Sequence, residues 1–579
     1  MWKTLIKSIR EYKKSSILAP AYVTAEVVIE CIIPFITALL VNQIKAGCTL
    51  DVILRYGLVL LVLASFSLIF GRLSGKAAAT AASGFARNLR KDMFYSIQSF
   101  SFENIDRFSS SSLVTRLTTD VSNVQNAYMM LIRVAIRSPL MLIFAVVMSF
   151  IMGGRLALIF VVVIPMLGIG LFFIIRKAFP IFRRVFRKYD ALNSSIQENV
   201  QGIRVVKSFV REDYEKQKFG VAAEELRASF TKAEKILAFN GPMMQFCLYI
   251  NMVFILTFGA YTIATTGGVD FNVGQLSSMM VYSFQTLMSL MMLSMVFVMV
   301  TIADESGRRI VEVLSEQSSL DNPGQPVFEV ADGSVDFDRV SFRYSKAAER
   351  MALSDIDLHI RSGETIGILG TTGSSKTTLV QLIPRLYDAT EGVVRVGGRD
   401  VKDYDLTALR NQVSVVLQNN LLFSGTIAEN LRWGNPNATD EELREACVLA
   451  QADEFIRSFP QGYETRIEQG GTNVSGGQKQ RLCIARALLK KPRILIFDDS
   501  TSAVDTHTDA KIRKGLREYL PETTKIIIAQ RVASVMDADR IVLMDKGSIT
   551  SVGTHEELLQ TNAIYREVFE SQNKAGEEE

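Results

Sequence analysis

Two short stretches of the sequence combine glycines, hydroxyls, a lysine and carboxylates at spacings that suit phosphate chemistry. The first, GTTGSSKTT at residues 370–378, follows an apolar strand-like run at 365–369. Backbone N–H groups at the start of a helix after such a loop can bind phosphate oxygens. Lys376 can reach the β and γ oxygens of a nucleotide, and the Thr377 hydroxyl can hold Mg²⁺. The alternative is a glycine turn ahead of an ordinary helix.

This loop departs from the usual pattern at one position. The pattern G-x-x-x-x-G-K-[ST] expects glycine directly before the lysine, where this chain has Ser375. A Cβ at that position is expected to crowd the phosphate or to strain the backbone. We therefore expect weakened nucleotide binding at a loop that is otherwise intact.

The second stretch, ILIFDDSTSAVD at residues 494–505, is an apolar strand that ends in Asp498 and Asp499. It has the pattern of a metal-holding strand in a nucleotide-hydrolysing protein. The second acid is unusual there, because a longer Glu is the residue that usually polarises the attacking water. Whether Asp499 can do so decides whether this chain hydrolyses ATP by itself.

The composition indicates a membrane protein of at least two units. A chain of 579 residues exceeds one domain of roughly 100–200 residues. Its 48% hydrophobic residues and mean hydropathy of +0.20 are high for a soluble protein of this size. The net charge of +4 argues against a nucleic acid as partner. Five scattered cysteines without CxxC spacing predict neither a disulfide framework nor a zinc site.

The first half of the sequence contains six apolar stretches, each near the length of about 20 residues that crosses a bilayer as a helix. They lie at residues 16–41, 53–73, 130–152, 155–175, 243–266 and 276–302. Lysine and arginine gather in the long segments between spans two and three and between spans four and five. By the positive-inside rule these segments and both termini are cytoplasmic.

The second half of the sequence predicts an α/β domain. A polar stretch with Pro and Gly follows residue 315 and has the composition of a linker. Beyond it, short β-branched strands alternate with amphipathic helical stretches, which is typical of a parallel sheet covered on both faces. We expect a transmembrane domain at 1–318, a linker at 319–334, a nucleotide-binding domain at 335–572 and a disordered acidic tail at 573–579.

A third motif, NVSGGQKQR at residues 473–481, resembles the signature motif of ATP-binding cassette (ABC) proteins. A metal-holding strand follows it after about 20 residues, as that family requires. Over essentially its whole length the chain resembles a half-transporter of the ABC exporter superfamily. The resemblance implies a six-span α-helical transmembrane domain followed by an α/β nucleotide-binding domain of the P-loop NTPase, ABC type. A soluble ATPase of this superfamily would lack the two long cytoplasmic loops.

The resemblance implies ATP and Mg²⁺ as cofactors and assigns a role to each motif residue. Tyr344 matches the aromatic that stacks on adenine, Gln418 matches the glutamine that contacts Mg²⁺ and the γ-phosphate, and Asp505 matches the loop that crosses the dimer interface. The implied nucleotide-binding residues are Tyr344, Gly370, Gly373, Ser374, Ser375, Lys376, Thr377, Thr378, Gln418, Ser475, Gly476, Gly477, Gln478 and Asp505, with Thr377, Gln418 and Asp498 around Mg²⁺.

Two further departures from the family pattern lie in the same composite site as Ser375. Asp499 stands at the position of the catalytic Glu, and Gln530 stands at the position of the switch histidine. Because ABC nucleotide domains pair head to tail, the intact signature at Ser475 to Gln478 would serve the partner's site. This asymmetry resembles the degenerate subunit of bacterial heterodimeric exporters. The alternative is a homodimer with two equally slow sites.

The expected function is export of drugs or other lipophilic compounds across a bacterial cytoplasmic membrane. Glu26 and Glu30 share one face of the first span and could bind cationic compounds or pair with Arg133 or Arg137. Met288, Met292 and Met295 in the sixth span could line an adaptable substrate site or serve ordinary helix packing. One alternative is a homodimeric lipid or peptide exporter, although the absence of an N-terminal peptidase disfavours a processing peptide exporter. The other is an ATP-gated regulatory or channel-like member.

Overall fold

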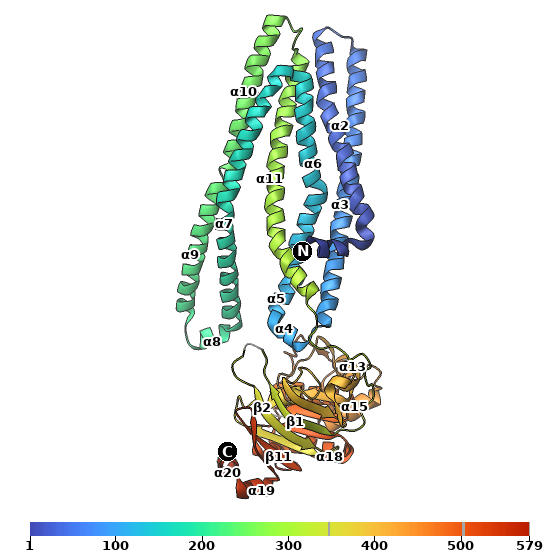
Figure 1. The fold of residues 1–579 in the computed structure, drawn as a ribbon, viewed down its shortest axis with the longest axis vertical. Coiled ribbons are helices and arrows are strands. Elements are labelled where there is room, and N and C mark those ends of the chain that lie inside the picture. Colours follow the sequence, from blue (N-terminus) through green and yellow to red (C-terminus); the bar gives the residue numbers. More distant parts are fainter. Residues whose placement is uncertain (346–347, 501–503, 578–579) are drawn as a thin grey trace. The chain divides into compact units, whose positions relative to one another are not determined.

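The computed structural model separates the chain into two compact units (Figure 1). It describes residues 1–345, 348–500 and 504–577, apart from the side chains at some positions between 179 and 201 and from 573 onward. The first unit comprises Met1–Gln98 and Ser109–Glu316, and the second comprises Ser99–Phe108 and Gln317–Glu579. The short segment Ser99–Phe108 therefore belongs with the C-terminal unit, although the chain enters and leaves it from the helical unit.

The first unit is entirely helical within its described residues. Long helices run along one another through its length (Figure 1). The elements are α1 (Trp2–Ile6), η1 (Lys7–Tyr12), α2 (Lys13–Lys45), α3 (Leu50–Gln98), α5 (Ser110–Thr115), η2 (Arg116–Asp120), α6 (Val121–Gly153), η3 (Gly154–Leu158), α7 (Ile159–Gln201), α8 (Ile203–Ser208), α9 (Glu212–Leu237), α10 (Asn240–Thr266) and α11 (Val273–Ser315).

Five helical segments of this unit are long and apolar enough to cross a membrane, and each of the six expected spans falls within one of them. The segment Ser110–Ala178 contains two of the expected spans, because α6 and α7 meet at η3, where Gly154 has a φ of +50°. The most apolar stretch of α3 has no buried residue. Leucines such as Leu54, Leu61 and Leu68 stand on its exposed surface, as expected for a helix that packs against lipid.

The second unit combines a helical layer with two main sheets. The antiparallel sheet has the order β2-β1-β4-β5, and the larger sheet has the order β12-β11-β3-β10-β9-β6. The strands are β1 (Val335–Phe342), β2 (Leu353–Ile360), β3 (Thr365–Gly370), β4 (Glu391–Val396), β5 (Arg399–Asp400), β6 (Val413–Val416), β7 (Gly425–Thr426), β8 (Arg466–Ile467), β9 (Ile494–Asp498), β10 (Thr524–Ile528), β11 (Arg540–Asp545) and β12 (Ser548–Gly553).

Helices cover this unit at both sides of the larger sheet and continue to the C-terminus. They are α4 (Phe102–Phe108), α12 (Lys376–Gln381), η4 (Val401–Asp403), α13 (Leu406–Gln412), α14 (Ile427–Arg432), α15 (Asp440–Leu449), α16 (Asp453–Ser458), η5 (Gly462–Glu464), α17 (Gly476–Leu488), α18 (Thr506–Tyr519), η6 (Val532–Ser534), α19 (His555–Thr561) and α20 (Ala563–Glu577). The expected tail at 573–579 overlaps the end of α20, and its residues 578–579 lie outside the described residues.

The register of the larger sheet brings the motif residues together. Its strands β11, β3, β10, β9 and β6 are parallel, and β12 is an antiparallel edge strand. Ile528 of β10 lies beside both Ile368 of β3 and Asp498 of β9. Every residue of β9 and β10 is buried, since separate hydrophobic clusters pack on the two faces of the sheet. The loops after β3, β9 and β10 therefore leave the sheet at one edge, which is where ligands bind in open parallel sheets.

Candidate nucleotide site

The loop between β3 and α12 is shaped to wrap around a phosphate group. Gly370 allows a close approach of two chain segments, because a Cβ there would lie 2.2 Å from the carbonyl oxygen of Met544. Gly373 has a φ of +85°, which a glycine adopts without strain. Lys376 Nζ donates to the carbonyl oxygens of Gly370 and Thr371, at 2.8 and 2.9 Å. The lysine thus folds back over the loop, where its ammonium group marks the position that suits an anionic ligand.

Ser375, the residue that departs from the glycine pattern, has a left-handed backbone. Its φ is +69° and its ψ is +25°, and its side chain makes no capping hydrogen bond at the start of α12. A residue with a Cβ is disfavoured in this conformation by roughly 1–2 kcal/mol. The expectation of strain at this position rests on that conformation, which a glycine would adopt freely.

The residues expected around Mg²⁺ supply hard oxygen ligands close together. Thr377 Oγ1 donates to Asp498 Oδ1 at 2.9 Å. Asp498 is 3% exposed, and this burial raises the pKa of its carboxyl group, against the hydrogen bond from Thr377. Burial lowers the pKa of the Lys376 ammonium group, although the nearby Asp499 and Asp498 carboxylates act to raise it. A hydroxyl and a buried carboxylate at this spacing fit Mg²⁺, which prefers oxygen ligands.

Asp499 accepts hydrogen bonds from two amide side chains, Gln418 and Gln530, of which Gln530 stands where the family pattern has the switch histidine. Its Oδ2 accepts a hydrogen bond from Gln530 Nε2 at 2.6 Å and from Gln418 Nε2 at 3.4 Å. Its backbone also has a left-handed φ of +48°, and its N–H donates to the carbonyl oxygen of Ile528 at 3.0 Å. The structure therefore brings Asp499, Gln530 and Gln418 into one hydrogen-bonded group beside Asp498.

The expected adenine-stacking residue, Tyr344, belongs to an aromatic group. Its hydroxyl lies 2.9 Å from Thr378 Oγ1, and the residue is 45% exposed. Its ring stands edge-on to the rings of Phe342 and Tyr387, at centroid distances of 4.9 and 5.3 Å. A partly exposed tyrosine in such an aromatic group is compatible with stacking on a planar ligand.

Tyr387 is a residue that sequence reasoning missed. Its hydroxyl donates to Asp106 Oδ2 at 2.7 Å, and its ring centroid lies 6.1 Å from that of Phe102. Burial raises the pKa of Tyr387, and the hydrogen bond with Asp106 raises it further. Both partners belong to α4, which lies between the second and third expected spans. The stretch that contains α4 resembles an intracellular loop of exporters, but the sequence contains no signal that Tyr387 is its partner.

The signature motif begins helix α17 with a complete capping box. Ser475 Oγ accepts from the N–H of Gln478 at 3.3 Å, and Gln478 Oε1 accepts from the N–H of Ser475 at 2.9 Å. Gly476 is exposed at the first helical position. The N-terminus of α17 thus presents backbone N–H groups and a positive dipole end, which favour phosphate.

Asp505, the expected interface residue, caps another helix. Its Oδ1 accepts from the N–H of Thr508 at 2.9 Å at the start of α18. This backbone hydrogen bond lowers the pKa of the Asp505 carboxyl group. Residues 501–503, between the carboxylates of β9 and this cap, lie outside the described residues.

The two acidic residues of the first span both contact one arginine of α6. Arg137 Nη2 donates to Glu30 at 2.7 and 2.9 Å, and Arg137 Nη1 donates to Glu26 Oε1. Glu26 is 6% exposed and lies against Gly71 of α3, where a Cβ would come within 3.0 Å of Glu26 Oε1. Of the two arginines considered from the sequence, Arg137 is the partner of both acids, while Arg133 lies beside Gly75.

The three methionines expected near substrate lie on α11 with different exposure. Met288 is partly buried, Met292 is 38% exposed and Met295 is 52% exposed. Positions three and four residues apart share one face of a helix, so the three form a stripe. The stripe is accessible in this single chain.

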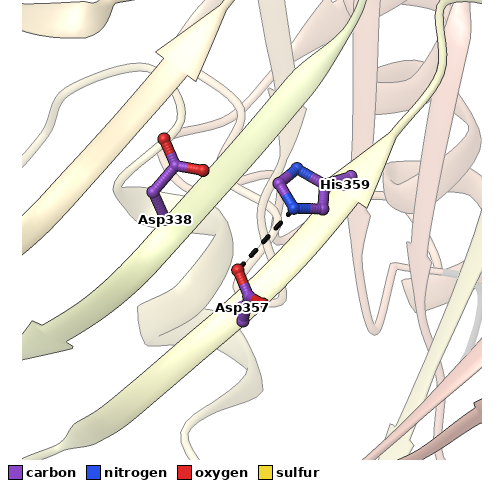
Figure 2. A group of neighbouring side chains, drawn as sticks. All are labelled: Asp338, Asp357 and His359. Carbon is purple, nitrogen blue, oxygen red and sulfur yellow. Dashed lines mark ion pairs between the residues drawn. The ribbon is translucent and has the colours of Figure 1, made fainter.

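A group of two aspartates and a histidine lies on the antiparallel sheet, outside the nucleotide motifs. Figure 2 shows Asp338 on β1 and Asp357 and His359 on β2, with His359 Nε2 3.7 Å from Asp357 Oδ1. Asp338 forms an ion pair with Arg395, and His359 Nδ1 lies 2.8 Å from Asp336 Oδ1. The hydrogen bond with Asp336 raises the pKa of His359. These contacts make the group a surface network of alternating charges.

Comparison with protein families agrees with this division of the chain. The model of the ABC transporter transmembrane region matches residues 17–290, and the ABC transporter model matches residues 353–502. The chain is 36% identical over 564 residues to the uncharacterized ABC transporter ATP-binding protein YfiB of Bacillus subtilis, which covers 97% of each chain. It is 33% identical over 485 residues to the multidrug efflux ATP-binding/permease protein Rv0194 of Mycobacterium tuberculosis, covering 83% of this chain and 40% of that one.

A solved structure shows the same fold. A bacterial Atm1-family ABC exporter with ATP bound has a TM-score of 0.82 and 24% identity, and the match covers 97% of this chain and 98% of that chain. The expected fold, a helical transmembrane domain followed by an α/β nucleotide-binding domain, is confirmed. The chain belongs to the ABC transporter family, with the exporter arrangement in which a transmembrane region and an ATP-binding domain are fused in one polypeptide.

Proposed function

We propose that this chain is one subunit of a heterodimeric ABC exporter that moves drugs or other lipophilic compounds out of the cytoplasm or the inner leaflet of a bacterial cytoplasmic membrane. In this proposal the chain spans the membrane six times, with both termini in the cytoplasm. Its own ATP site is slow, and its signature motif completes a faster site on the partner subunit. The similarity to a multidrug efflux protein supports the substrate class.

The observation that carries the proposal is the hydrogen-bonded group around Asp499. Its carboxylate accepts from Gln530 and Gln418, so it is bonded to the side chains that would otherwise meet the γ-phosphate. An Asp is one methylene shorter than a Glu, roughly 1.5 Å of reach. A misplacement of about 1 Å at a reacting group can lower a rate of order a hundredfold. Asp499 is therefore poorly placed to polarise a water for attack.

The other residues of the loop remain suited to binding. On nucleotide binding, Lys376 would exchange its bonds with the carbonyl oxygens of Gly370 and Thr371 for phosphate oxygens. Thr377 and Asp498 would hold Mg²⁺, which neutralises phosphate charge when bound. The site would thus hold ATP for long periods and hydrolyse it slowly.

The signature motif supports the proposal that this chain acts as one subunit of a dimer. In this family each ATP lies between the phosphate loop of one domain and the signature motif of the other. The capping box at Ser475 fixes the start of α17, so that its exposed N–H groups are ready for the phosphate of a nucleotide on the partner subunit. Hydrolysis would take place mainly there.

The contacts of the two acidic side chains in the first span support a structural role for them more than a role in binding cations. Arg137 contacts both Glu26 and Glu30, so one positive charge already offsets part of their negative charge. Breaking such a pair inside a bilayer leaves a charge unpaired at a cost of about 3–5 kcal/mol. We propose the methionine stripe of α11, rather than these acids, as the adaptable surface for lipophilic compounds.

The test of this function is the ATPase activity of the full chain in lipid, alone and co-purified with the product of an adjacent half-transporter gene. Near-zero activity alone that the partner restores would support a degenerate subunit. Robust activity of the chain alone would contradict it and would favour a homodimer in which Asp499 and Gln530 sustain hydrolysis. The signature variant described below then identifies which site is active.

A further inference from the structure

Residues of two helices of the transmembrane unit line an open cavity of about 490 Å³. One wall is formed by residues of α7 and the other by residues of α11, more than a hundred residues later in the chain; Figure 1 labels both helices. Its volume lies within the range of about 300–1,000 Å³ that is usual for small-molecule sites. It is large enough for an acyl chain.

The chemistry of the cavity is apolar along most of its length and cationic at one position. Leu171, Phe172 and Ile175 of α7 face Leu290 and Phe297 of α11. Ser294 and Thr301 add two hydroxyls. The one ionised side chain of the lining is Arg176, at the cytoplasmic end of the span expected at 155–175. The lining therefore matches a molecule with an apolar body and one anionic group.

The charge of Arg176 is not offset within the cavity. Among the described residues of this unit, no ion pair includes Arg176, and the acids that follow Thr301 on α11, Asp304 and Glu305, contact Arg308 instead. Arg176 is exposed at the end of the expected span, and an anionic partner would stabilise its guanidinium beside the apolar side chains of the lining. The guanidinium offers five N–H donors in a planar fork that matches carboxylate or phosphate oxygens.

We propose that this cavity binds an amphipathic anion, with its apolar chain between α7 and α11 and its anionic head on Arg176. This inference adds a substrate class to the exporter proposed above. Only the transport of the bound molecule, and not its binding, rests on that proposed function. The head group is a carboxylate or a phosphate. A free fatty acid and an anionic phospholipid share this chemistry, and the experiment distinguishes them.

Gly168 provides a way to close the cavity without disturbing the fold. It lies in the lining, and a Cβ at this position would meet no atom within 4 Å. Gly168→Leu is therefore expected to fill the cavity at no steric cost. Gly57 of α3 is a matched control, because a Cβ there also meets no atom within 4 Å and the position lies outside the cavity.

The experiment is photo-crosslinking of the full chain in lipid nanodiscs without nucleotide, so that its outcome is independent of ATP hydrolysis. The probes are a palmitic acid with a diazirine in its chain, the amine with the same chain, and a phosphatidylglycerol with the same diazirine. Mass spectrometry locates the labelled residues. We expect the acid or the phosphatidylglycerol to label α7 and α11 around Phe172 and Leu290 about tenfold more than the amine.

The variants test the role of each part of the cavity. Arg176→Gln is expected to remove the preference for the anionic probes, Arg176→Lys to keep it, and Lys177→Gln, one residue beyond the lining, to leave it unchanged. Gly168→Leu is expected to lower labelling by every probe, and Gly57→Leu to leave it as it was. Circular dichroism and size-exclusion chromatography confirm that each variant is folded.

Each outcome decides the proposal. Labelling by palmitic acid but not by phosphatidylglycerol supports a free amphipathic anion, and the reverse supports a membrane phospholipid. Equal labelling by the amine, or equal loss in Arg176→Gln and Lys177→Gln, would overturn the proposal. If the anionic preference holds while the chain alone is a robust ATPase, the cavity assignment stands and the heterodimer proposal fails.

Discussion

The starts of two helices in the nucleotide-binding unit, α12 after the phosphate loop and α17 after the signature motif, have opposite local structure, although we propose that both bind phosphate. Both begin with backbone N–H groups, which can bind phosphate oxygens at a helix N-terminus. Helix α12 begins after Ser375, which has a left-handed φ of +69° and no side-chain cap. Helix α17 begins after Ser475, which has an extended backbone and a complete capping box.

The side chains near the two helix starts also differ, in how far they are already hydrogen-bonded within the chain. Beside α12, Lys376 is bonded to carbonyl oxygens of its own loop, and Asp499 is bonded to Gln530 and Gln418. The signature motif needs no adjustment of that kind, since its capping bonds are local and Gly476 is exposed. The positions that depart from the family pattern thus lie together at and around the phosphate loop, away from the signature motif. The comparison agrees with our proposal that this chain keeps an intact signature half-site for a partner while its own phosphate-loop half-site is slow.

The strongest test of this comparison replaces an exposed glycine of the signature helix. In the assembled exporter, Gly476→Asp is expected to lower ATP turnover at least about 100-fold, because a carboxylate at a helix N-terminus stabilises the helix but repels a phosphate. Thr407→Asp, also exposed and in the first turn of α13, is the control and should leave turnover unchanged.

The companion variant, Lys376→Ala, changes the phosphate loop. If the phosphate loop of this chain belongs to a slow site, the substitution is expected to lower turnover of the assembled exporter only about 2- to 5-fold, since most hydrolysis takes place at the other site. Steady-state ATPase assays measure both variants. Equal losses in Gly476→Asp and Lys376→Ala would mean that the two halves contribute alike.

The second test restores the chemistry of the phosphate-loop half. Asp499→Glu combined with Gln530→His is expected to raise turnover of the assembled exporter about tenfold, because the longer acid reaches further and the amide that holds Asp499 Oδ2 is removed. Gln530→His alone is the control for the lost hydrogen bond. An unchanged rate in the double variant would assign the slow step to Ser375 or to the partner's signature motif.

The fold and the grouping of the nucleotide residues could be predicted because they depend on local patterns. Six apolar stretches and a run of β-branched strands determine the two kinds of domain, and the glycine, lysine and carboxylate motifs sit at the ends of parallel strands. The left-handed backbone at Ser375 was also foreseeable, since the family pattern requires glycine there.

Contacts between segments far apart in the chain could not be predicted in the same way. Arg137 was one of two arginines that the spacing allowed for Glu26 and Glu30, and only the packing of α2 against α6 selects it. Tyr387 and Asp106 are separated by more than 280 positions, and Tyr387 belongs to none of the motifs. The cavity at Arg176 depends on how α7 lies along α11, which no periodicity of a single helix reveals.

The third test relieves the strain of the phosphate loop. Ser375→Gly is expected to raise the free energy of unfolding by about 1 kcal/mol and to tighten binding of a non-hydrolysable ATP analogue about fivefold, because glycine adopts a φ of +69° freely. Lys546→Gly is the control, at a φ of +47° in the turn between β11 and β12. It should raise the melting temperature similarly without a change in ATP affinity. The same affinity in Ser375→Gly and the original chain would show that the serine Cβ does not hinder the phosphate.

The smallest expected effect concerns the link between the phosphate-loop half and α4. Tyr387→Phe keeps the ring contacts with Tyr344 and Phe102 but removes the hydrogen bond to Asp106, which is worth about 1 kcal/mol. If this contact passes substrate binding on to the ATP site, basal ATPase activity should change little while its stimulation by a transported lipophile falls about threefold. Tyr404→Phe is the control, because the Tyr404 hydroxyl also makes one hydrogen bond in this unit, to the carbonyl oxygen of Val396 at 2.8 Å. A similar loss of stability in both variants with lost stimulation in Tyr387→Phe alone would assign coupling to the aromatic group beside Tyr344, and so to the nucleotide site that we propose is slow.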